Sequence, residues 1–183
     1  MLVNFHKCEF VQQSLVYLGY VIGGGEMKID PSNIEAIMKW SVPTNVYEVM
    51  SFIGASQYMR KFIASFLLVV APLHAITTSG KGFQWGKVQQ KTFKEIKKNI
   101  SQEPFLELPN LQRPFDVDTY ASGYTTRVVL MQGVRLVCYH SKVFHGEVLN
   151  YPTYNKELYA IVQSMKKWKH YLMRKEIIMH IDH

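Results

Sequence analysis

The first thirty residues carry the hydrophobic pattern of a β-hairpin. Residues 14–22 are rich in aliphatic and aromatic side chains and predict a strand. Gly23-Gly24-Gly25 follow, and such residues readily adopt the positive φ angles of a tight turn. Residues 27–29 then predict the returning strand. Asp30-Pro31 predict a helix start, with Asp30 as N-cap and Pro31 at the first helical position.

The next seventy residues change to helical spacing. A short helix ends before Pro43, and a second, capped by Thr44 or Asn45, is expected to run to about residue 62. The apolar stripes are Ile34, Ile37 and Met38 in the first helix and Val46, Val49, Met50 and Ile53 in the second. Pro72 and the polar run 77–80 predict a looser stretch. A third helix is expected over 87–100, with Phe93, Ile96 and Ile100 buried.

From about residue 112 the pattern alternates and predicts a sheet. Strands are expected over 115–119, 126–132 and 135–140, with Gly133 in a tight turn. Residues 154–172 predict a long helix, and residues 177–181 a fourth strand. The buried stripe of that helix is predicted to be Leu158, Ile161, Val162, Met165 and Trp168. The chain therefore predicts an α+β or α/β fold in which helices precede a mixed sheet. Because the series β-β-β-α-β stops at a strand, we expect a truncated domain.

The charge of the chain indicates an anionic partner. Among 183 residues, 21 Lys and Arg stand against 14 Asp and Glu, which gives a net charge of +7. Residues 1–110 hold eleven basic and eight acidic side chains, and residues 111–183 hold ten and six. The surplus is therefore spread along the chain and excludes a disordered basic arm. Nucleic acid is the first candidate partner and an acidic membrane surface the second.

Composition also indicates in which cellular compartment the protein is expected. Cys8 and Cys138 are far apart in sequence and form no Cys/His motif, so a disulfide framework or structural zinc is not expected. The longest apolar stretch, residues 62–73, is shorter than the roughly twenty residues that a membrane span needs. The N-terminus has no signal-peptide pattern. We therefore expect an intracellular protein without a membrane partner, in the cytoplasm or nucleus.

A collinear series of short motifs covers almost the whole chain and resembles the Pol polyprotein of gypsy-class LTR retrotransposons. In the first half the series includes Lys7-Cys8-Glu9-Phe10, Tyr17-Leu18-Gly19-Tyr20, Asp30-Pro31, Ser51-Phe52-Ile53-Gly54, Arg60-Lys61-Phe62-Ile63 and Ala71-Pro72-Leu73. In the second half it includes Ala121-Ser122, Tyr139-His140-Ser141-Lys142, Lys156-Glu157-Leu158-Tyr159-Ala160, Trp168-Lys169-His170-Tyr171-Leu172 and Asp182-His183. Each motif is weak alone, but the ordered series is specific.

The resemblance implies a division of the chain. Residues 1–75 resemble the end of a reverse-transcriptase palm, with a primer-grip-like hairpin, followed by thumb-like helices. Residues 76–111 resemble the connection, and residues 112–183 a truncated RNase H-like domain. The residues implied in nucleic-acid binding are Tyr17, Gly19, Tyr20, Arg60, Lys61 and Lys142. The partner implied is an RNA/DNA hybrid or duplex, whose phosphates the excess of Lys and Arg would contact.

The resemblance also implies a nuclease site, and the sequence departs from it. Such domains hold two Mg²⁺ ions between carboxylates, and here Glu157 and Asp182 match two of them. At the position of the family's first-strand aspartate, this sequence has Tyr120. A neutral phenol cannot bridge two hard cations. Asp118 is the candidate substitute, but two residues along a strand are about 7 Å apart. Arg127 adds a positive charge where the family has a small residue. We therefore expect Mg²⁺ as the implied cofactor, an incomplete site, and an inactive or crippled nuclease.

Several alternatives remain open at this point. The polymerase reaction is not expected, because no Asp-Asp pair occurs in the sequence. The leading hypothesis is a catalytically inactive fragment that retains nucleic-acid binding. The first alternative is a Mg²⁺-dependent RNase H, completed by another chain. The second is a co-opted interaction module that interferes with retroelement or viral replication, with its protein partner at the unfinished sheet edge. Lys91, Lys94 and Lys98 share one helix side, which is either an ordinary solvated face or a face that follows phosphates.

Overall fold

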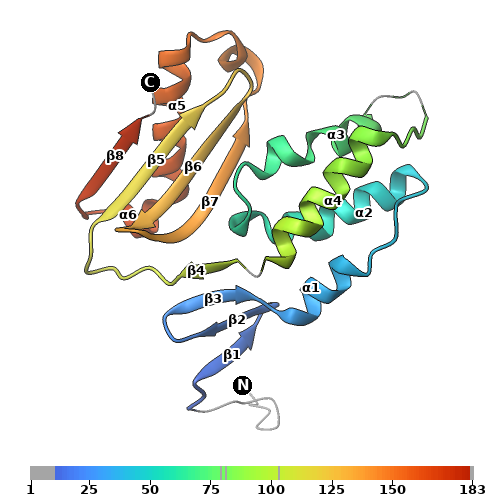
Figure 1. Cartoon of the computed structure of the whole chain (residues 1–183). Helices are drawn as coiled ribbons and strands as arrows, with labels where there is room; N and C mark the ends of the chain where they lie inside the picture. The colour runs from blue at the N-terminus through green and yellow to red at the C-terminus, as the bar shows by residue number, and fades with distance from the viewer. Residues whose placement is uncertain (1–10, 79, 81, 103, 182–183) are drawn as a thin grey trace, which may run out of the picture.

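The computed structural model describes residues 11–78, 80, 82–102 and 104–181, which form two sheets and a group of helices (Figure 1). The elements of the first half are β1 (Ser14–Tyr17), β2 (Tyr20–Gly23), β3 (Glu26–Ile29), α1 (Pro31–Met38), α2 (Val46–Tyr58), η2 (Arg60–Phe62), α3 (Phe66–Thr78) and α4 (Lys87–Ser101). Those that follow are β4 (Phe105–Glu107), β5 (Phe115–Ala121), β6 (Thr125–Gln132), β7 (Arg135–Val143), η3 (Gly146–Asn150), α5 (Thr153–Lys167), α6 (Lys169–Leu172) and β8 (Ile177–Ile181). The predicted α+β class, with helices preceding a mixed sheet, is confirmed.

The first sheet is antiparallel, with strand order β1-β2-β3-β4. The single strand predicted over 14–22 is wrong, because the chain turns at Leu18 and Gly19 and pairs Tyr17 with Tyr20. Both turn residues have positive φ angles, 47° and 71°, as a type I′ turn in a two-residue β-hairpin loop requires. Two turn residues inside an apolar run hardly change the hydrophobic pattern, so the pattern did not predict this turn. The segment at 105–107, which the pattern did not predict, supplies the fourth strand.

Two helix starts were predicted correctly from their capping residues. The Asp30 carboxylate accepts a hydrogen bond from the backbone N–H of Ser32 at 2.9 Å. The Asn45 side chain accepts from the backbone N–H of Glu48 at 2.9 Å. The Glu48 carboxylate in turn accepts from the backbone N–H of Thr44 at 2.7 Å, and this bond lowers the pKa of Glu48. These local bonds satisfy amide groups that the first helical turn leaves unpaired.

The predicted apolar stripe of α2 is partly wrong. Val49 and Ile53 are buried, but the side chain of Met50 is 49% exposed. Phe52, which the predicted stripe omitted, is fully buried and contacts Phe93 with ring centroids 4.5 Å apart. The buried face is therefore shifted toward α4, because tertiary packing selects which apolar residues of a helix point inward.

The stretch around Pro72, predicted to be loose, is the helix α3. Phe66, Val70, Leu73 and Ile76 are buried at helical spacing. Their burial outweighs the backbone hydrogen bond that Pro72 cannot donate. Among the helices of the described residues, none is long and apolar enough to cross a membrane.

The first core lies between the helices and the first sheet. It includes Ile29, Phe52, Phe66, Phe93, Ile96, Ile100 and Leu106. The predicted helix over 87–100 is confirmed as α4, and its predicted buried residues are confirmed too. Lys97 of α4 donates hydrogen bonds to the carbonyl oxygens of Met38 at 2.9 Å and Trp40 at 2.6 Å. These bonds fix α4 against the end of α1.

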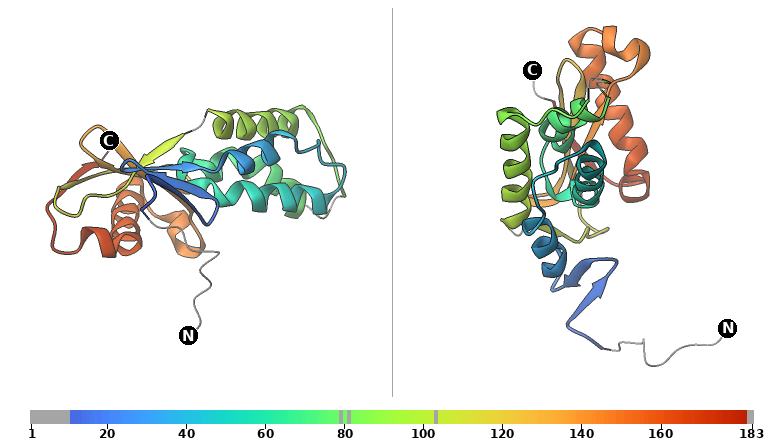
Figure 2. Two further views of the ribbon diagram at one scale, coloured as in Figure 1. Left: turned by 90° about the horizontal axis from the view of Figure 1, so that it is seen from below. Right: turned by 90° about the vertical axis from the view of Figure 1, so that its right-hand side faces the viewer.

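The second sheet is mixed, with strand order β7-β6-β5-β8. Strands β5 and β6 and strands β6 and β7 are antiparallel, whereas β5 and β8 are parallel and pair Thr119 with Ile181. Helix α5 packs on one face of this sheet, as Figure 1 and Figure 2 show. Among the described helices of the same half, none covers the opposite face.

The prediction for the helix over 154–172 was right in position and partly wrong in orientation. The helix is interrupted at Trp168, where α5 gives way to α6. The buried residues of α5 are Glu157, Ala160 and Ser164. Of the predicted stripe, Trp168 is buried in the second core and Met165 packs against it. Leu158 and Val162, both predicted to be buried, are 43% and 48% exposed. The buried face of α5 therefore includes two small side chains and one carboxylate, so hydrophobicity alone does not decide which face is buried here.

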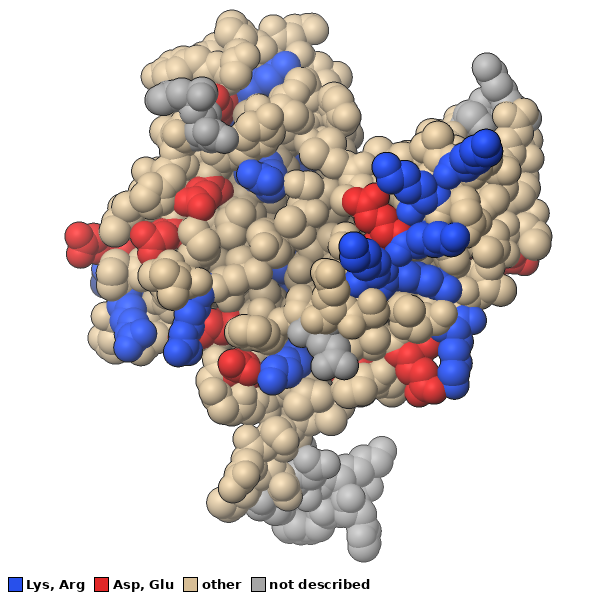
Figure 3. Space-filling model, in the orientation of Figure 1, with Lys and Arg blue, Asp and Glu red and all other residues tan. Residues whose placement is uncertain are grey.

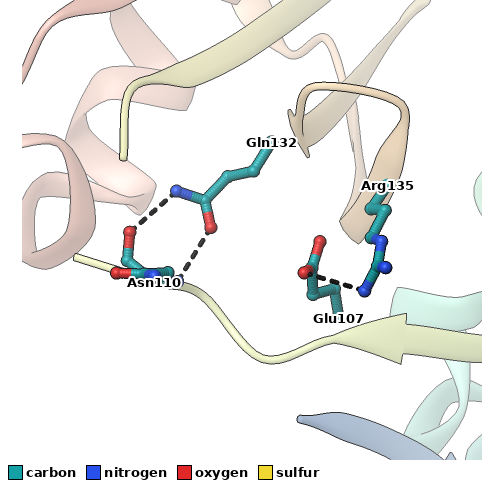
Figure 4. A network of polar contacts seen from close by, with 4 residues as sticks. All are labelled: Glu107, Asn110, Gln132 and Arg135. Carbon is teal, nitrogen blue, oxygen red and sulfur yellow. Dashed lines mark hydrogen bonds and ion pairs between the residues drawn. The ribbon is translucent and has the colours of Figure 1, made fainter. Parts of the chain in front are cut away.

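Polar and apolar contacts join the two halves of the molecule, at β7 and along the segment that leads from β4 to β5. Gln132 and Asn110 exchange two hydrogen bonds of 2.8 Å, and Arg135 pairs with Glu107 at 3.3 Å (Figure 4). Cys138 of β7 contacts both cores. The free Cys138 thiol is largely buried, which raises its pKa to about 12, and Cys8 lies outside the described residues.

The predicted boundaries at 75, 76–111 and 112–183 stay a prediction. Residues of the middle segment pack with those of the first, since β4 pairs with β3 and α4 contacts α1 and α3.

Candidate functional site

Tyr120 and Asp118 lie on the face of the second sheet that points away from α5. Along β5, Phe115, Val117 and Thr119 are buried, and the residues between them point to the other face. The side chain of Tyr120 is 41% exposed. Asp118, Tyr120, Arg127, Val129, Met131 and His180 line a hollow of about 420 Å³ on this face. The prediction that Asp118 and Tyr120 share a strand face agrees with this placement.

Arg127 lies directly across from Tyr120 on the neighbouring strand. The central carbon of its guanidinium is 5.3 Å from the centroid of the Tyr120 ring, which is the geometry of a cation–π contact. Within the part of the chain that the structure describes, Arg127 forms no ion pair. A protein cation therefore occupies the space beside the aromatic ring.

Glu157 lies on the buried face of α5 and is 7% exposed. The other matched carboxylate, Asp182, lies outside the described residues. Among residues 11–78, 80, 82–102 and 104–181, no three His, Cys, Asp or Glu side chains are grouped closely enough to hold a metal ion. On the open face, the Nε2 of His180 lies 3.8 Å from a carboxylate oxygen of Asp116.

Mg²⁺ is the cofactor that the sequence resemblance implies, and the described residues do not fit a pair of such ions. Divalent magnesium needs carboxylate oxygens, whereas the β5 position implied for the bridging carboxylate holds the Tyr120 phenol. The Arg127 guanidinium beside it would repel a divalent cation. No chemical step through magnesium follows from this arrangement.

A second feature is a basic groove between the starts of η2 and α3, strand β7 and helix α5. Its volume is about 550 Å³. Its charged and titratable lining residues are Arg60, His140, Lys142, His145, Lys166 and Lys167, and no Asp or Glu of the described residues lines it. Two residues predicted to bind nucleic acid, Arg60 and Lys142, are therefore brought together in this groove from sequence positions about eighty residues apart.

Hydrogen bonds hold the two predicted residues in place. The Arg60 guanidinium donates to the carbonyl oxygen of Ser141 at 2.9 Å. The Lys142 ammonium donates to the side-chain oxygen of Gln163 at 2.7 Å. Both side chains line the groove, where a bound anion would add to their hydrogen bonds.

His140 is a neutral group of the groove. Burial lowers its pKa to about 4, and the neighbouring charges of Arg60, Lys167 and Lys142 act in the same direction with smaller effect. The imidazole is therefore neutral at pH 7. It packs edge-on against Trp168, with ring centroids 6.1 Å apart. The positive charge of the groove therefore comes from its Lys and Arg side chains and not from His140.

The four other residues predicted to bind nucleic acid lie elsewhere. Tyr17 is 57% exposed at the β1–β2 turn, beside Gly19. The Tyr20 ring stacks on Tyr58 with centroids 4.8 Å apart, and burial raises the pKa of its hydroxyl. The Lys61 ammonium lies 3.7 Å from the centroid of the Tyr20 ring, and burial lowers its pKa. Tyr20 and Lys61 therefore contact each other within the protein and do not line the basic groove.

The sequence prediction missed the α5 side of the groove. Lys166 and Lys167 are both exposed and extend the positive lining beyond Arg60 and Lys142. Their signal in the sequence is an adjacent pair of lysines near a helix C-terminus, a position that lysine favours in any helix. That signal does not distinguish a ligand-binding pair from an ordinary helix end.

Comparison with known proteins connects these features to one family. Residues 85–179, just over half of the chain, match the family described as "RNase H-like domain found in reverse transcriptase". The chain is 29% identical over 182 residues to the retrovirus-related Pol polyprotein from transposon 297 of Drosophila melanogaster, covering 99% of this chain and 17% of the relative. It is 30% identical over 196 residues to the Pol polyprotein from transposon gypsy of the same organism, covering 100% of this chain and 19% of the relative. The chain thus spans less than a fifth of either relative.

A solved structure shares the fold. The foamy viral protease-reverse transcriptase in complex with RNA/DNA hybrid superposes with a TM-score of 0.83 at 18% identity. The similarity covers 96% of this chain and 25% of the foamy viral chain. Both halves of the molecule, and not the second sheet alone, therefore follow a known arrangement.

Proposed function

This chain belongs to the family of RNase H-like domains found in reverse transcriptases, and we propose that it binds an RNA/DNA hybrid or duplex without cleaving it. The observation that carries the proposal is the basic groove, whose described lining holds four Lys and Arg side chains and no acid. Each contact between such a side chain and a phosphate gains free energy mainly by releasing counterions. The fold neighbour was solved with an RNA/DNA hybrid, which favours the same class of ligand here.

The proposed binding is independent of base sequence. Lys and Arg contacts to phosphates fix the position of a duplex but do not read its bases. The groove joins η2 and α3 of the first half to β7 and α5 of the second. A duplex in the groove would therefore contact both halves at once. The thumb-like role of residues 30–75 and the primer-grip role of Tyr17, Gly19 and Tyr20 belong to the same proposal.

The absence of cleavage is proposed from the Tyr120–Arg127 pair. In a working site, two metal ions stabilise the attacking and leaving oxygens. The Tyr120 phenol is not the carboxylate ligand that such ions need, and the Arg127 guanidinium, 5.3 Å from its ring, would repel them. Asp118 lies on the same face, but Arg127 lines the hollow with it. The proposal is therefore a binding protein derived from a nuclease.

The binding proposal is tested by the salt dependence of hybrid affinity. We expect the affinity of the full chain for a labelled RNA/DNA hybrid to fall steeply as salt rises. The variant Lys166→Gln/Lys167→Gln removes two groove cations and should lower the slope of log K against log salt by about 2. The matched control Lys169→Gln/Lys175→Gln removes two exposed cations that do not line the groove, and should leave the slope unchanged.

The comparison of the two double variants decides whether hybrid binding depends on the groove or on the net charge of the chain. An equal effect of both double variants would overturn the groove as the binding site, because net charge alone would then explain the affinity. No binding of the wild-type chain to hybrid or duplex at low salt would overturn the proposed function itself. Circular dichroism of all variants establishes that each one is folded.

A second candidate function is protein binding at β8. Among the described strands, β8 pairs only with β5 and lies at the edge of its sheet. Ile178 is 45% exposed. An edge strand can pair with a strand of another chain. Replacing Ile178 by Pro should abolish capture of a retroelement Pol protein and leave hybrid affinity unchanged, whereas unchanged capture would overturn this candidate.

A further inference from the structure

Helix α4 carries a row of four lysines on its exposed side. Lys87, Lys91, Lys94 and Lys98 are spaced by four, three and four residues, which places them on one stripe of the helix. The opposite side of α4 is buried in the first core. The row is about 16 Å long at 1.5 Å per residue. Figure 3 shows Lys and Arg side chains gathered over α4. We call these four residues the lysine row.

The lysine row has no ion-pair partner among the described residues. None of its four lysines forms an ion pair there, whereas Lys39 pairs with Glu35 and Lys28 with Glu26 at 3.1 Å. The one acidic residue of α4 is Glu95. Like charges three and four residues apart destabilise a helix. Glu95, four residues after Lys91 and three before Lys98, offsets this repulsion in part, and an anion from outside would offset more of it.

An aromatic ring lies at the first end of the row. Trp85, Lys87, Lys91 and Lys94 line a hollow of about 640 Å³, and no acidic residue of the described chain lines it. The Trp85 indole donates a hydrogen bond to the side-chain oxygen of Gln90 at 2.9 Å. The ring also stacks on Phe83, with centroids 6.1 Å apart, and meets Phe93 edge-on at 5.9 Å. These contacts fix the orientation of the indole before any ligand binds.

We propose that the lysine row and Trp85 form a site for single-stranded nucleic acid. Lysines at regular spacing contact consecutive phosphates, and a fixed aromatic ring stacks on an unpaired base. A duplex cannot use the ring, because its bases are stacked within the helix. The site is separate from the basic groove, since α4 and α5 lie on opposite sides of the molecule in the right-hand view of Figure 2. The proposal of this single-strand site does not depend on hybrid binding in the basic groove.

The probe for this site is oligo(dT) of about 15 nucleotides, which has no secondary structure and one kind of base. The variant Lys87→Gln/Lys91→Gln/Lys94→Gln should lower the salt slope of oligo(dT) binding by about 2, because each lysine that no longer neutralises a phosphate lowers the slope by roughly 0.7. The matched control is Arg113→Gln/Lys169→Gln/Lys175→Gln, which removes three exposed cations away from the row. We expect no change of slope in the control.

Trp85→Leu tests stacking. It keeps an apolar side chain and removes the aromatic face, and we expect roughly tenfold weaker oligo(dT) binding with an unchanged salt slope. Where this variant does not fold, quenching of tryptophan fluorescence by oligo(dT) replaces it, measured in Trp40→Phe/Trp168→Phe, in which Trp85 is the one remaining tryptophan of the sequence. Quenching in this double variant supports stacking on Trp85, and no quenching overturns it.

Crossing the two sets of variants separates this site from the groove. The lysine-row variant should lose oligo(dT) affinity and keep hybrid affinity, and Lys166→Gln/Lys167→Gln should do the reverse. A lysine-row variant that binds oligo(dT) as the wild type does would overturn the inference and leave the groove proposal standing. Binding of the wild type to vesicles of anionic lipid that disappears in the lysine-row variant, with oligo(dT) affinity unchanged, would overturn it in favour of a membrane surface.

Discussion

The Arg127 guanidinium faces the ring of Tyr120 across two paired strands, 5.3 Å from the ring centroid. Our proposal that the chain does not cleave a hybrid rests on this contact, because the family resemblance implies a metal-bridging carboxylate at the position of Tyr120. A carboxylate introduced at residue 120 would still face the Arg127 cation, and removal of Arg127 would still leave a phenol at residue 120.

The first prediction concerns hybrid cleavage. We expect no cleavage of a labelled RNA/DNA hybrid by the wild-type chain in Mg²⁺ or Mn²⁺. We expect none by Tyr120→Asp either, because Arg127 keeps its positive charge beside the new carboxylate. Gel analysis of the labelled RNA strand over time is the measurement. Cleavage by the wild type that disappears in Glu157→Gln would show a working nuclease and contradict the prediction.

The second prediction concerns the β1–β2 turn. Gly19 has a φ of 71°, and a Cβ there would lie 2.7 Å from the Asn33 amide nitrogen and 3.0 Å from the Tyr58 hydroxyl. We expect Gly19→Ala to lower the free energy of unfolding by about 2 kcal/mol or more, measured in urea. Gly24→Ala is the matched control, since φ is 59° with nothing within 4 Å, and should cost only about 1 kcal/mol. Equal costs would show that the close contacts at Gly19 are without effect.

The third prediction concerns the packing face of α5. Ala160 is fully buried against the sheet, whereas Val162 is 48% exposed. Ala160→Leu should therefore destabilise the chain by about 1–3 kcal/mol through overpacking. Val162→Lys should change stability by less than about 0.5 kcal/mol, because its side chain points outward. Thermal unfolding of both variants is the measurement, and the reverse order of effects would restore the stripe predicted from hydrophobicity.

The fourth prediction concerns pH. His140 is neutral in the folded chain because its pKa is lowered to about 4, while in the unfolded chain it titrates near about 6.5. The unfolded state therefore takes up this proton first as pH falls. The contribution of His140 to stability is present above about pH 6.5 and disappears between there and about pH 4.

His140→Gln removes that linkage. We expect its stability to fall less than that of the wild type between about pH 6.5 and about pH 5, a window above the range where most carboxylates titrate. Urea unfolding at several pH values measures the difference. Parallel curves for the two proteins would show that His140 takes up its proton equally in the folded and unfolded states.

Much of the fold could be predicted from local signals. Asp30 and Asn45 fix helix starts through bonds to amides two and three residues away, and Gly133 marks a turn with a φ of 62°. The alternation along β5 correctly predicted that Asp118 and Tyr120 share a face. The prediction failed where two apolar faces competed, as at Met50 of α2 and Leu158 of α5. Hydrophobicity alone does not show which neighbour a helix will meet.

The sequence by itself determined the family resemblance, the positive charge, the presence of a tyrosine at residue 120 and most element positions, because each depends on residue identity or short-range hydrogen bonds. Only the tertiary structure decided that Arg60 and Lys142 meet Lys166 and Lys167 in one groove, and that Lys61 packs against Tyr20 instead. It also decided that Arg127 contacts Tyr120. The physical reason is that electrostatic and packing energies depend on distances between residues remote in sequence, and chain topology sets those distances.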